Sequence, residues 1–216
     1  MPPTAIRRPA PRDPRRLARY ALFVIVPLAL AVQYWLDEDV TAADLSGFSF
    51  DRTAGWTYLT ETTVAPAQGR IRFTPTALAA AIRAGQNAPL FALAKYARPQ
   101  GGLNPAIGVN VALEAAAATA SPRDVLERGM AETEARLGGA LQRTEPLTAT
   151  TLSGLPAARV RYTGGDDING GTALVVYAVI IGRTSLLIAA SGTQSGADAI
   201  DAPLQAFVGS LAVERY

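Results

Sequence analysis

Apolar and polar residues alternate along much of the final third of the chain, which is the pattern of β-strands. Residues 148–151, 157–162, 172–181 and 184–190 are rich in β-branched and apolar residues, and glycine-containing turns separate them. Consecutive strands joined by such turns pair side by side in opposite directions. The pattern therefore predicts an antiparallel meander.

Shorter strand patterns precede this meander. Residues 48–50 and 56–60 alternate on either side of a turn and predict an opening hairpin, and residues 70–73 predict a further short strand. Residues 106–113 alternate between two turn signals and predict a strand, whereas residues 90–96 fit a helix or a strand.

Three segments carry helical signals. Thr74 and Pro75 supply an N-cap and a first helical position, and they predict a helix over residues 77–84. A second helix opens at Ser121, and a third covers residues 202–211. Each of these two helices has an apolar face. In the second helix it consists of Val125, Leu126, Met130, Leu137 and Leu141, and in the third it consists of Leu204, Phe207, Val208 and Leu211. Because amphipathic helices cover sheets, we expect an α+β fold, a mostly antiparallel β-sheet with helices packed on its faces.

An uncharged apolar segment lies N-terminal to these elements. It covers residues 20–36, follows an arginine- and proline-rich stretch and precedes three acidic residues. Its 17 residues are at the lower limit of the roughly 17 to 25 that a membrane-spanning helix needs. We expect a disordered tail over 1–19, a transmembrane signal-anchor over 20–36, a juxtamembrane linker over 37–46 and an extracytoplasmic domain over 47–216.

Charge sets the expected orientation of this segment. Six arginines, including Arg15, Arg16 and Arg19, precede it, and the positive-inside rule places them in the cytoplasm. Tyr34 and Trp35 suit the opposite membrane interface. The chain would then contact the lipid bilayer through residues 20–36 and lie in the cytoplasmic (inner) membrane, with its C-terminal domain periplasmic or extracellular. The alternative is cleavage of a signal peptide near Ala31, which would release a soluble, secreted ligand-binding domain.

Composition removes several kinds of chemistry. The chain has no cysteine and no histidine, so disulfides, thiol nucleophiles, catalytic triads with histidine and ordinary zinc sites are excluded. The sequence pI of about 9.1 reflects the arginine-rich tail, and therefore no nucleic acid partner is expected.

The loop over residues 164–171 is the most polar candidate site. Asp166, Asp167 and Asn169 offer oxygen ligands that calcium prefers. Their spacing does not match a calcium-binding EF-hand loop, because Gly165 and Val176 fall where that loop needs Asp and Glu. A turn between two strands is the favoured interpretation.

The remaining candidates have ordinary structural interpretations. Glu127, Glu132 and Glu134 share the second helix with arginines, which indicates a solvated face with ion pairs, although paired carboxylates also serve glycoside hydrolases. Lys95 and Ser191 lack the partners that nucleophilic catalysis needs. The aromatic residues that would line a ligand groove, but that fit a core as well, are Trp56, Tyr58 and Phe73.

Several short motifs resemble the PsbP-like α/β/α sandwich family, in particular its bacterial, membrane-anchored relatives. The motifs are the turn before Trp56, residues 93–96, Asn104-Pro105, residues 155–162 and the closing helix with Phe207, and the resemblance covers residues 46–214. It implies an antiparallel sheet with helices on both faces. It also implies binding or assembly rather than catalysis, with no cofactor or metal carried over, because the histidine-dependent features of the plant namesake have no counterpart here.

The expected function is therefore that of an extracytoplasmic binding or assembly accessory module, anchored by one transmembrane segment, with a protein partner at the membrane. A carboxylate-dependent hydrolase of envelope glycans is the enzymatic alternative.

Overall fold

The computed structural model describes residues 40–61, 66–67, 69–83, 90–96, 104–114, 120–137, 140–164, 171–194 and 198–214. The tail and the apolar segment at 1–36 lie outside these residues. Within them, no helix has the length and apolar character required to cross a membrane.

The described residues form two antiparallel sheets and three α-helices. The larger sheet has seven strands in the order β2-β5-β6-β10-β9-β8-β7, and the smaller has four in the order β11-β1-β4-β3. The strands are β1 (Gly47–Asp51), β2 (Thr57–Glu61), β3 (Pro66–Ala67), β4 (Arg70–Phe73), β5 (Phe91–Ala94), β6 (Ala106–Leu113), β7 (Leu141–Leu152), β8 (Leu155–Gly164), β9 (Thr172–Ile181), β10 (Thr184–Thr193) and β11 (Ala212–Glu214). The helices are the short 3-10 helix η2 (Ala42–Asp44) and the α-helices α2 (Pro75–Arg83), α3 (Pro122–Leu137) and α4 (Asp198–Gly209).

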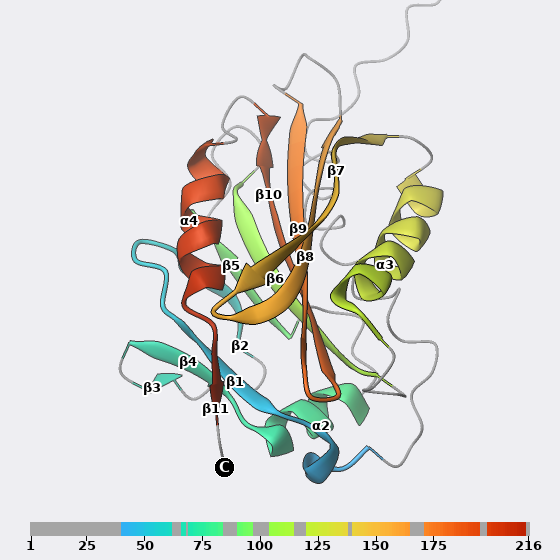
Figure 1. Cartoon of the computed structure of the whole chain (residues 1–216). Helices are drawn as coiled ribbons and strands as arrows, with labels where there is room; N and C mark the ends of the chain where they lie inside the picture. The colour runs from blue at the N-terminus through green and yellow to red at the C-terminus, as the bar shows by residue number, and fades with distance from the viewer. Residues whose placement is uncertain are drawn as a thin grey trace, which may run out of the picture.

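The large sheet separates two apolar cores. Helix α3 lies against one face and α4 against the other; the small sheet lies below α4, and α2 lies at the bottom of the view (Figure 1). The core on the α4 side is the larger, and it joins the aromatic side chains of both sheets to α2 and α4. The core on the α3 side contains Val125, Leu126 and Met130 of the helix and residues of β7 to β10. The predicted α+β class, with helices on both faces of an antiparallel sheet, is confirmed.

The predicted meander is confirmed in the C-terminal part of the large sheet. Strand β8 pairs with β9 and β9 with β10, both antiparallel, and a tight turn at Gly182 links the last two. Residues 90–96, which fitted a helix or a strand, contain strand β5, and all four of its residues are buried. Helix α4 begins at Asp198, earlier than predicted, and therefore has Pro203 in its interior.

The predicted opening hairpin is wrong. Strands β1 and β2 both form, but β1 pairs with β4 and β11 in the small sheet, whereas β2 pairs with β5 at the edge of the large sheet. Packing between distant residues decides this pairing: the rings of Phe48 and Phe73 stack with centroids 4.9 Å apart, and both are fully buried. Local alternation predicts a strand, but it does not select the partner strand.

The predicted apolar face of the second helix included Leu141, which lies beyond the end of the observed helix. Helix α3 ends at Leu137, and Leu141 instead opens strand β7. Gly138 and Gly139 lie between the two in the sequence, and glycine is a poor helix former. As a result β7 begins seven residues before the predicted strand at 148–151. Strands β3 and β11 were not predicted, because two or three residues are too few for a recognisable alternation.

Candidate functional site

Several predicted site residues lie outside the described part of the chain. These are Arg15, Arg16, Arg19, Tyr34 and Trp35 of the N-terminal segment, together with Asp166, Asp167 and Asn169 of the polar loop. The strands that flank this loop are described, and Gly164 of β8 pairs with Thr172 of β9, as expected for a connection between adjacent strands. Within the described residues, no group of three or more acidic side chains has the arrangement of a metal site.

Two of the predicted aromatic residues belong to the core. Phe73 is fully buried, and Trp56 is partly buried against the same cluster. The Nζ atom of Lys95 lies 5.5 Å from the ring centroid of Tyr96. This cation–π contact gives the lysine an ordinary structural role. Asn104 bonds to the backbone N–H and carbonyl of Tyr96 through its side-chain amide, so it ties the residues after β5 to those before β6.

Two carboxylates of α3 are engaged by arginines. Glu127 receives a 3.1 Å hydrogen bond from Arg123 on the same helix, and Glu134 receives one of 3.0 Å from Arg143 of β7. Tyr162 also donates to Glu134 Oε1, at 2.6 Å. This bond is the largest cause of the lowered pKa of Glu134, and burial raises the pKa of the Tyr162 phenol.

The direction of these shifts bears on the hydrolase alternative. The carboxyl groups of Asp44, Asp124 and Glu134 have lowered pKa values, in each case chiefly because a neighbouring hydroxyl donates a hydrogen bond. A general acid in a glycosidase needs a raised pKa near neutral pH. These three groups are therefore suited to ion pairing rather than to proton donation.

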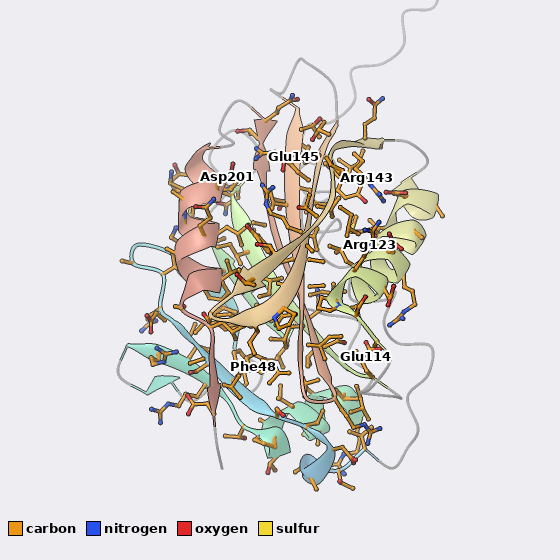
Figure 2. All side chains as sticks on the ribbon, in the orientation of Figure 1. Phe48, Glu114, Arg123, Arg143, Glu145 and Asp201 are labelled. Atoms are coloured by element: carbon orange, nitrogen blue, oxygen red, sulfur yellow. The ribbon has the colours of Figure 1, made fainter. Side chains whose placement is uncertain are left out.

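An irregularity in β7 assembles a second group of charges on the other face of the large sheet. Residues two apart in a strand normally point to the same face, but Arg143 lies opposite Tyr162 and Glu145 lies opposite Arg161, so one extra residue stands between them. Arg143 therefore points to the α3 face and Glu145 to the α4 face. Figure 2 shows the two side chains at this edge, with Asp201 nearby on α4.

We name the residues on the α4 face the edge cluster: Glu145, Arg159, Arg161 and Asp201. Glu145 bonds to Arg159, while Arg161 lies 2.7 Å from Asp201 and 3.9 Å from Glu145. The guanidinium of Arg159 also lies over the Tyr177 ring, 5.9 Å from its centroid. The arginine side chains are 23% and 15% exposed, so these pairs are better shielded from water than ordinary surface pairs. The cluster fixes β7, β8 and α4 to one another.

The sequence contained a signal for this cluster that was not used. Arg159 and Arg161 are two apart in a strand and must share a face, which places two positive charges against the sheet. Glu145 could not be assigned to that face, because regular alternation places it with Arg143.

A different polar feature lies inside the α3 face of the sheet. Asn110 of β6 and Ser191 of β10 are 4% and 1% exposed, and neither the amide atoms of Asn110 nor the Ser191 hydroxyl has a hydrogen-bond partner. Native proteins rarely leave such groups unpaired in their interior. Asn110 was not predicted as a site residue, although it is the one amide side chain in this apolar strand, because the sequence cannot show that the amide lacks a partner.

Comparison with known proteins gives structural matches without sequence matches. No family model matches the chain, and no curated protein matches it. Among solved structures it is similar to LpqN of Mycobacterium tuberculosis, which is involved in cell envelope biogenesis, with 14% identity, a TM-score of 0.51 and coverage of 78% of this chain and 83% of that chain.

Two further matches have lower scores. Cyanobacterial PsbP from Synechocystis sp. PCC 6803 matches with 12% identity, a TM-score of 0.42 and coverage of 78% of this chain and 93% of that one. A Pseudomonas aeruginosa protein of unknown function, PA94, matches with 10% identity, a TM-score of 0.42 and coverage of 72% of this chain and 97% of that one. At such identities a likeness concerns the fold alone. The described architecture, an antiparallel sheet with helices on both faces, is the one that the predicted resemblance to the PsbP-like family implies, and LpqN shares this α+β fold.

Proposed function

We propose that this chain is an accessory module of the cell envelope that binds a protein partner and does not catalyse a reaction. Residues 20–36 hold it in the cytoplasmic membrane, and residues 47–216 form the binding domain on the outer side. The observation that carries the binding proposal is the exposed edge of the large sheet at β7. The involvement of LpqN in cell envelope biogenesis supports the envelope setting.

Strand β7 is the last strand of the large sheet, and at 12 residues it is the longest described. Most of its side chains are exposed, including Gln142, Thr148 and Thr151, and no other described strand pairs with its outer side. Pro146 and two register shifts interrupt the row of backbone groups along this edge. Such interruptions oppose the addition of a continuous strand from another molecule. A partner would therefore contact this edge mainly through side chains.

The edge is also held rigid before a partner arrives. Arg143 is fixed on one face by Glu134, and Glu145 on the other by Arg159. The side chains of Arg143 and Glu145 remain 39% and 41% exposed, so both are available to a partner. Side chains that are already ordered lose less conformational entropy on binding, and arginine is enriched at protein interfaces. The edge thus supports a polar contact with a protein.

Site-specific photo-crosslinking in native membranes tests the binding proposal. We place a photo-reactive residue at Gln142 or at Thr151 of β7 in the full chain, and at the exposed Gln205 of α4 as the control. The expected result is one discrete crosslinked protein from both β7 positions and not from Gln205. The proposal fails if the β7 positions give no crosslinked protein, or give the same products as Gln205.

The membrane anchor is tested separately. The intact mass of the natively expressed protein and its behaviour in carbonate extraction report whether residues 20–36 are retained. A full-length mass in the membrane pellet is expected. A mass that begins near Val32, with the protein in the soluble fraction, would instead favour signal-peptide cleavage and a secreted domain.

A further inference from the structure

Buried side chains fix the place where the chain enters the domain. Val40, the first described residue, is 3% exposed, and Leu45, which follows η2, is 6% exposed. Both belong to the core on the α4 side of the large sheet. Residues 40–46 therefore pack as part of the domain, and only residues 37–39 lie between them and the apolar segment in the sequence.

Polar contacts hold the same entry against the end of the large sheet. Asp44 of η2 accepts hydrogen bonds from the backbone N–H and the hydroxyl of Thr41, at 3.1 and 2.8 Å. It also pairs at 2.7 Å with Arg183, which lies in the β9–β10 turn. The backbone N–H of Ser46 donates a 3.0 Å hydrogen bond to the hydroxyl of Thr184, the first residue of β10. These contacts prevent η2 from moving independently of the β9–β10 turn.

Helix α2 extends the surface around this entry. It packs beside η2, and Figure 1 shows η2 in blue, α2 and the β9–β10 turn together at the lower end of the molecule. The α2 residues Thr76, Ala80 and Arg83 are exposed and recur at spacings of four and three, so they share one face, opposite the buried Leu78 and Ile82. We define the entry surface as five exposed residues: Ala43, Thr76, Ala80, Gly182 and Arg83.

The charges of the entry surface suit phospholipid headgroups. Among η2, α2 and the β9–β10 turn, Asp44 is the one carboxylate, and it is already paired with Arg183. The Nε of Arg83 donates to the Ala79 carbonyl of its own helix at 3.3 Å, and no carboxylate of the described residues pairs with this arginine. An arginine binds phosphate through two parallel hydrogen bonds. The entry surface therefore offers a guanidinium group and small side chains to a layer of phosphates.

The length of chain before the domain limits how far this surface can lie from a bilayer. Leu36 ends the apolar segment, and Val40 follows it by four residues. Four residues cover at most about 14 Å when fully extended. The headgroup layer on one side of a bilayer takes up about 5–8 Å of that distance. With residues 20–36 across the membrane, the entry therefore lies within about 10 Å of the headgroups.

We propose that the entry surface lies against the phospholipid headgroups and that the large sheet extends away from the bilayer. This orientation rests on the proposed anchor at residues 20–36, and it adds the surface that contacts the lipid. Strand β10 begins beside the entry at Thr184 and runs for ten residues toward the opposite end of the sheet (Figure 1). Gln194, which follows it, is thereby held about 30 Å from the entry.

Short-range fluorescence quenching of the full chain in liposomes tests this orientation. The chain has no cysteine, so a single introduced cysteine carries a fluorophore at a chosen position. Ala43→Cys and Ala80→Cys place it on the entry surface, and Gln194→Cys, also at an exposed position, is the control at the opposite end of β10. The liposomes consist of phosphatidylcholine and phosphatidylglycerol, with some of the phosphatidylcholine carrying a nitroxide on its headgroup.

The expected result is a loss of most of the fluorescence at positions 43 and 80 and little loss at position 194. Because the nitroxide lipid is present in both leaflets, insertion of the chain in either direction gives this result. Ala43 and Ala80 lie on different elements, so one position still measures the orientation if the variant at the other folds poorly.

Flotation of the same liposomes after carbonate treatment separates the orientation from the anchor. A chain that does not float lacks the proposed anchor, and the orientation fails with it. A chain that floats keeps the anchor, and three results then overturn the orientation alone. These are equal quenching at all three positions, which indicates a freely tumbling domain, quenching at position 194 only, and no quenching at any position.

Discussion

The Tyr162 hydroxyl donates a 2.6 Å hydrogen bond to Glu134 Oε1 and so connects the interior of β8 to the partly exposed side of helix α3. Tyr162 is fully buried, whereas the side chain of Glu134 is 40% exposed. The same oxygen accepts a hydrogen bond from Arg143, so one carboxylate joins a helix to two strands. Removal of any one of these three side chains should therefore weaken the attachment of α3 to the sheet.

Replacement of Tyr162 by Phe should destabilise the protein by about 1–2 kcal/mol at neutral pH. The substitution keeps the buried ring and removes only the hydroxyl, so the loss is that of one hydrogen bond to a charged acceptor that water partly screens. Urea unfolding measures the change. Thr144→Val removes an exposed hydroxyl whose only described bond is a 3.5 Å contact with the Arg161 carbonyl, and it should change stability by less than about 0.5 kcal/mol.

The difference between Tyr162→Phe and the natural chain should depend on pH. The Tyr162 hydrogen bond lowers the pKa of Glu134 below 4.5, so it favours the charged carboxylate of the folded state. The resulting stability is present above the pKa of the unfolded state and is lost as pH falls through the lower folded pKa. Urea unfolding at pH 7 and below pH 4 should therefore show a smaller difference in acid. An equal or larger difference in acid would contradict the assigned role of Glu134.

The edge cluster should show coupling between Glu145 and Asp201, because Arg161 lies within reach of both. Glu145→Gln and Asp201→Asn should each cost about 1–2 kcal/mol, more than exposed pairs do, because Arg159 and Arg161 are mostly shielded from water. The double variant should differ from the sum by at least about 0.5 kcal/mol. Simple additivity in the urea unfolding free energies would show that Arg161 does not link the two carboxylates.

The sequence predicted the positions of the helices and strands better than it predicted which strands pair. The cap at Thr74 and Pro75 located α2, and alternation located β8, β9 and β10, because these signals depend on residues close together in the chain. Phe48 instead pairs with Phe73 on one side and with Val213 on the other. No local pattern encodes contacts between such distant segments, so the small sheet was missed.

The same reasoning applies to the candidate sites. The extra residue between Arg143 and Glu145 moves Glu145 to the α4 face, and alternation alone predicts the opposite. Asn110 is visible in the sequence as a polar residue in an apolar strand, but its missing partner is a property of the folded chain. Neither the edge cluster nor Asn110 was therefore predicted as a site, because the fold and not the local pattern determines the neighbours of these residues.

The β7–β8 hairpin offers a test of backbone conformation that is separate from packing. Its turn has Ser153 at φ 50° and Gly154 at φ 80°, both in the left-handed region, between the paired residues Leu152 and Leu155. A Cβ at Gly154 would meet no atom within 4 Å, so the effect of Gly154→Ala is backbone strain alone. We expect a loss of about 1 kcal/mol in the free energy of unfolding. Gly209→Ala, also in open space but at the end of α4 and without a positive φ, should be neutral or slightly stabilising.

Phe207 holds helix α4 against both sheets, and its removal should destabilise β11 as well as the helix. Its ring stacks on Phe50 of the small sheet at 4.3 Å and on Phe91 of the large sheet at 6.2 Å. Phe207→Ala should cost about 3–5 kcal/mol through the cavity that it leaves. Because β11 follows α4 directly and pairs with β1, hydrogen exchange should accelerate in both α4 and β11.

The exchange pattern separates this role from general destabilisation. Val213 lies in β11 with 42% of its surface exposed, so Val213→Ala should leave both stability and exchange almost unchanged. In Phe207→Ala the α4 and β11 amides should open at a lower free energy than those of β9 and β10, which have partner strands on both sides. If all these segments accelerate equally, α4 is not an independently opening unit, and its contact with Phe50 and Phe91 stabilises the domain as a whole.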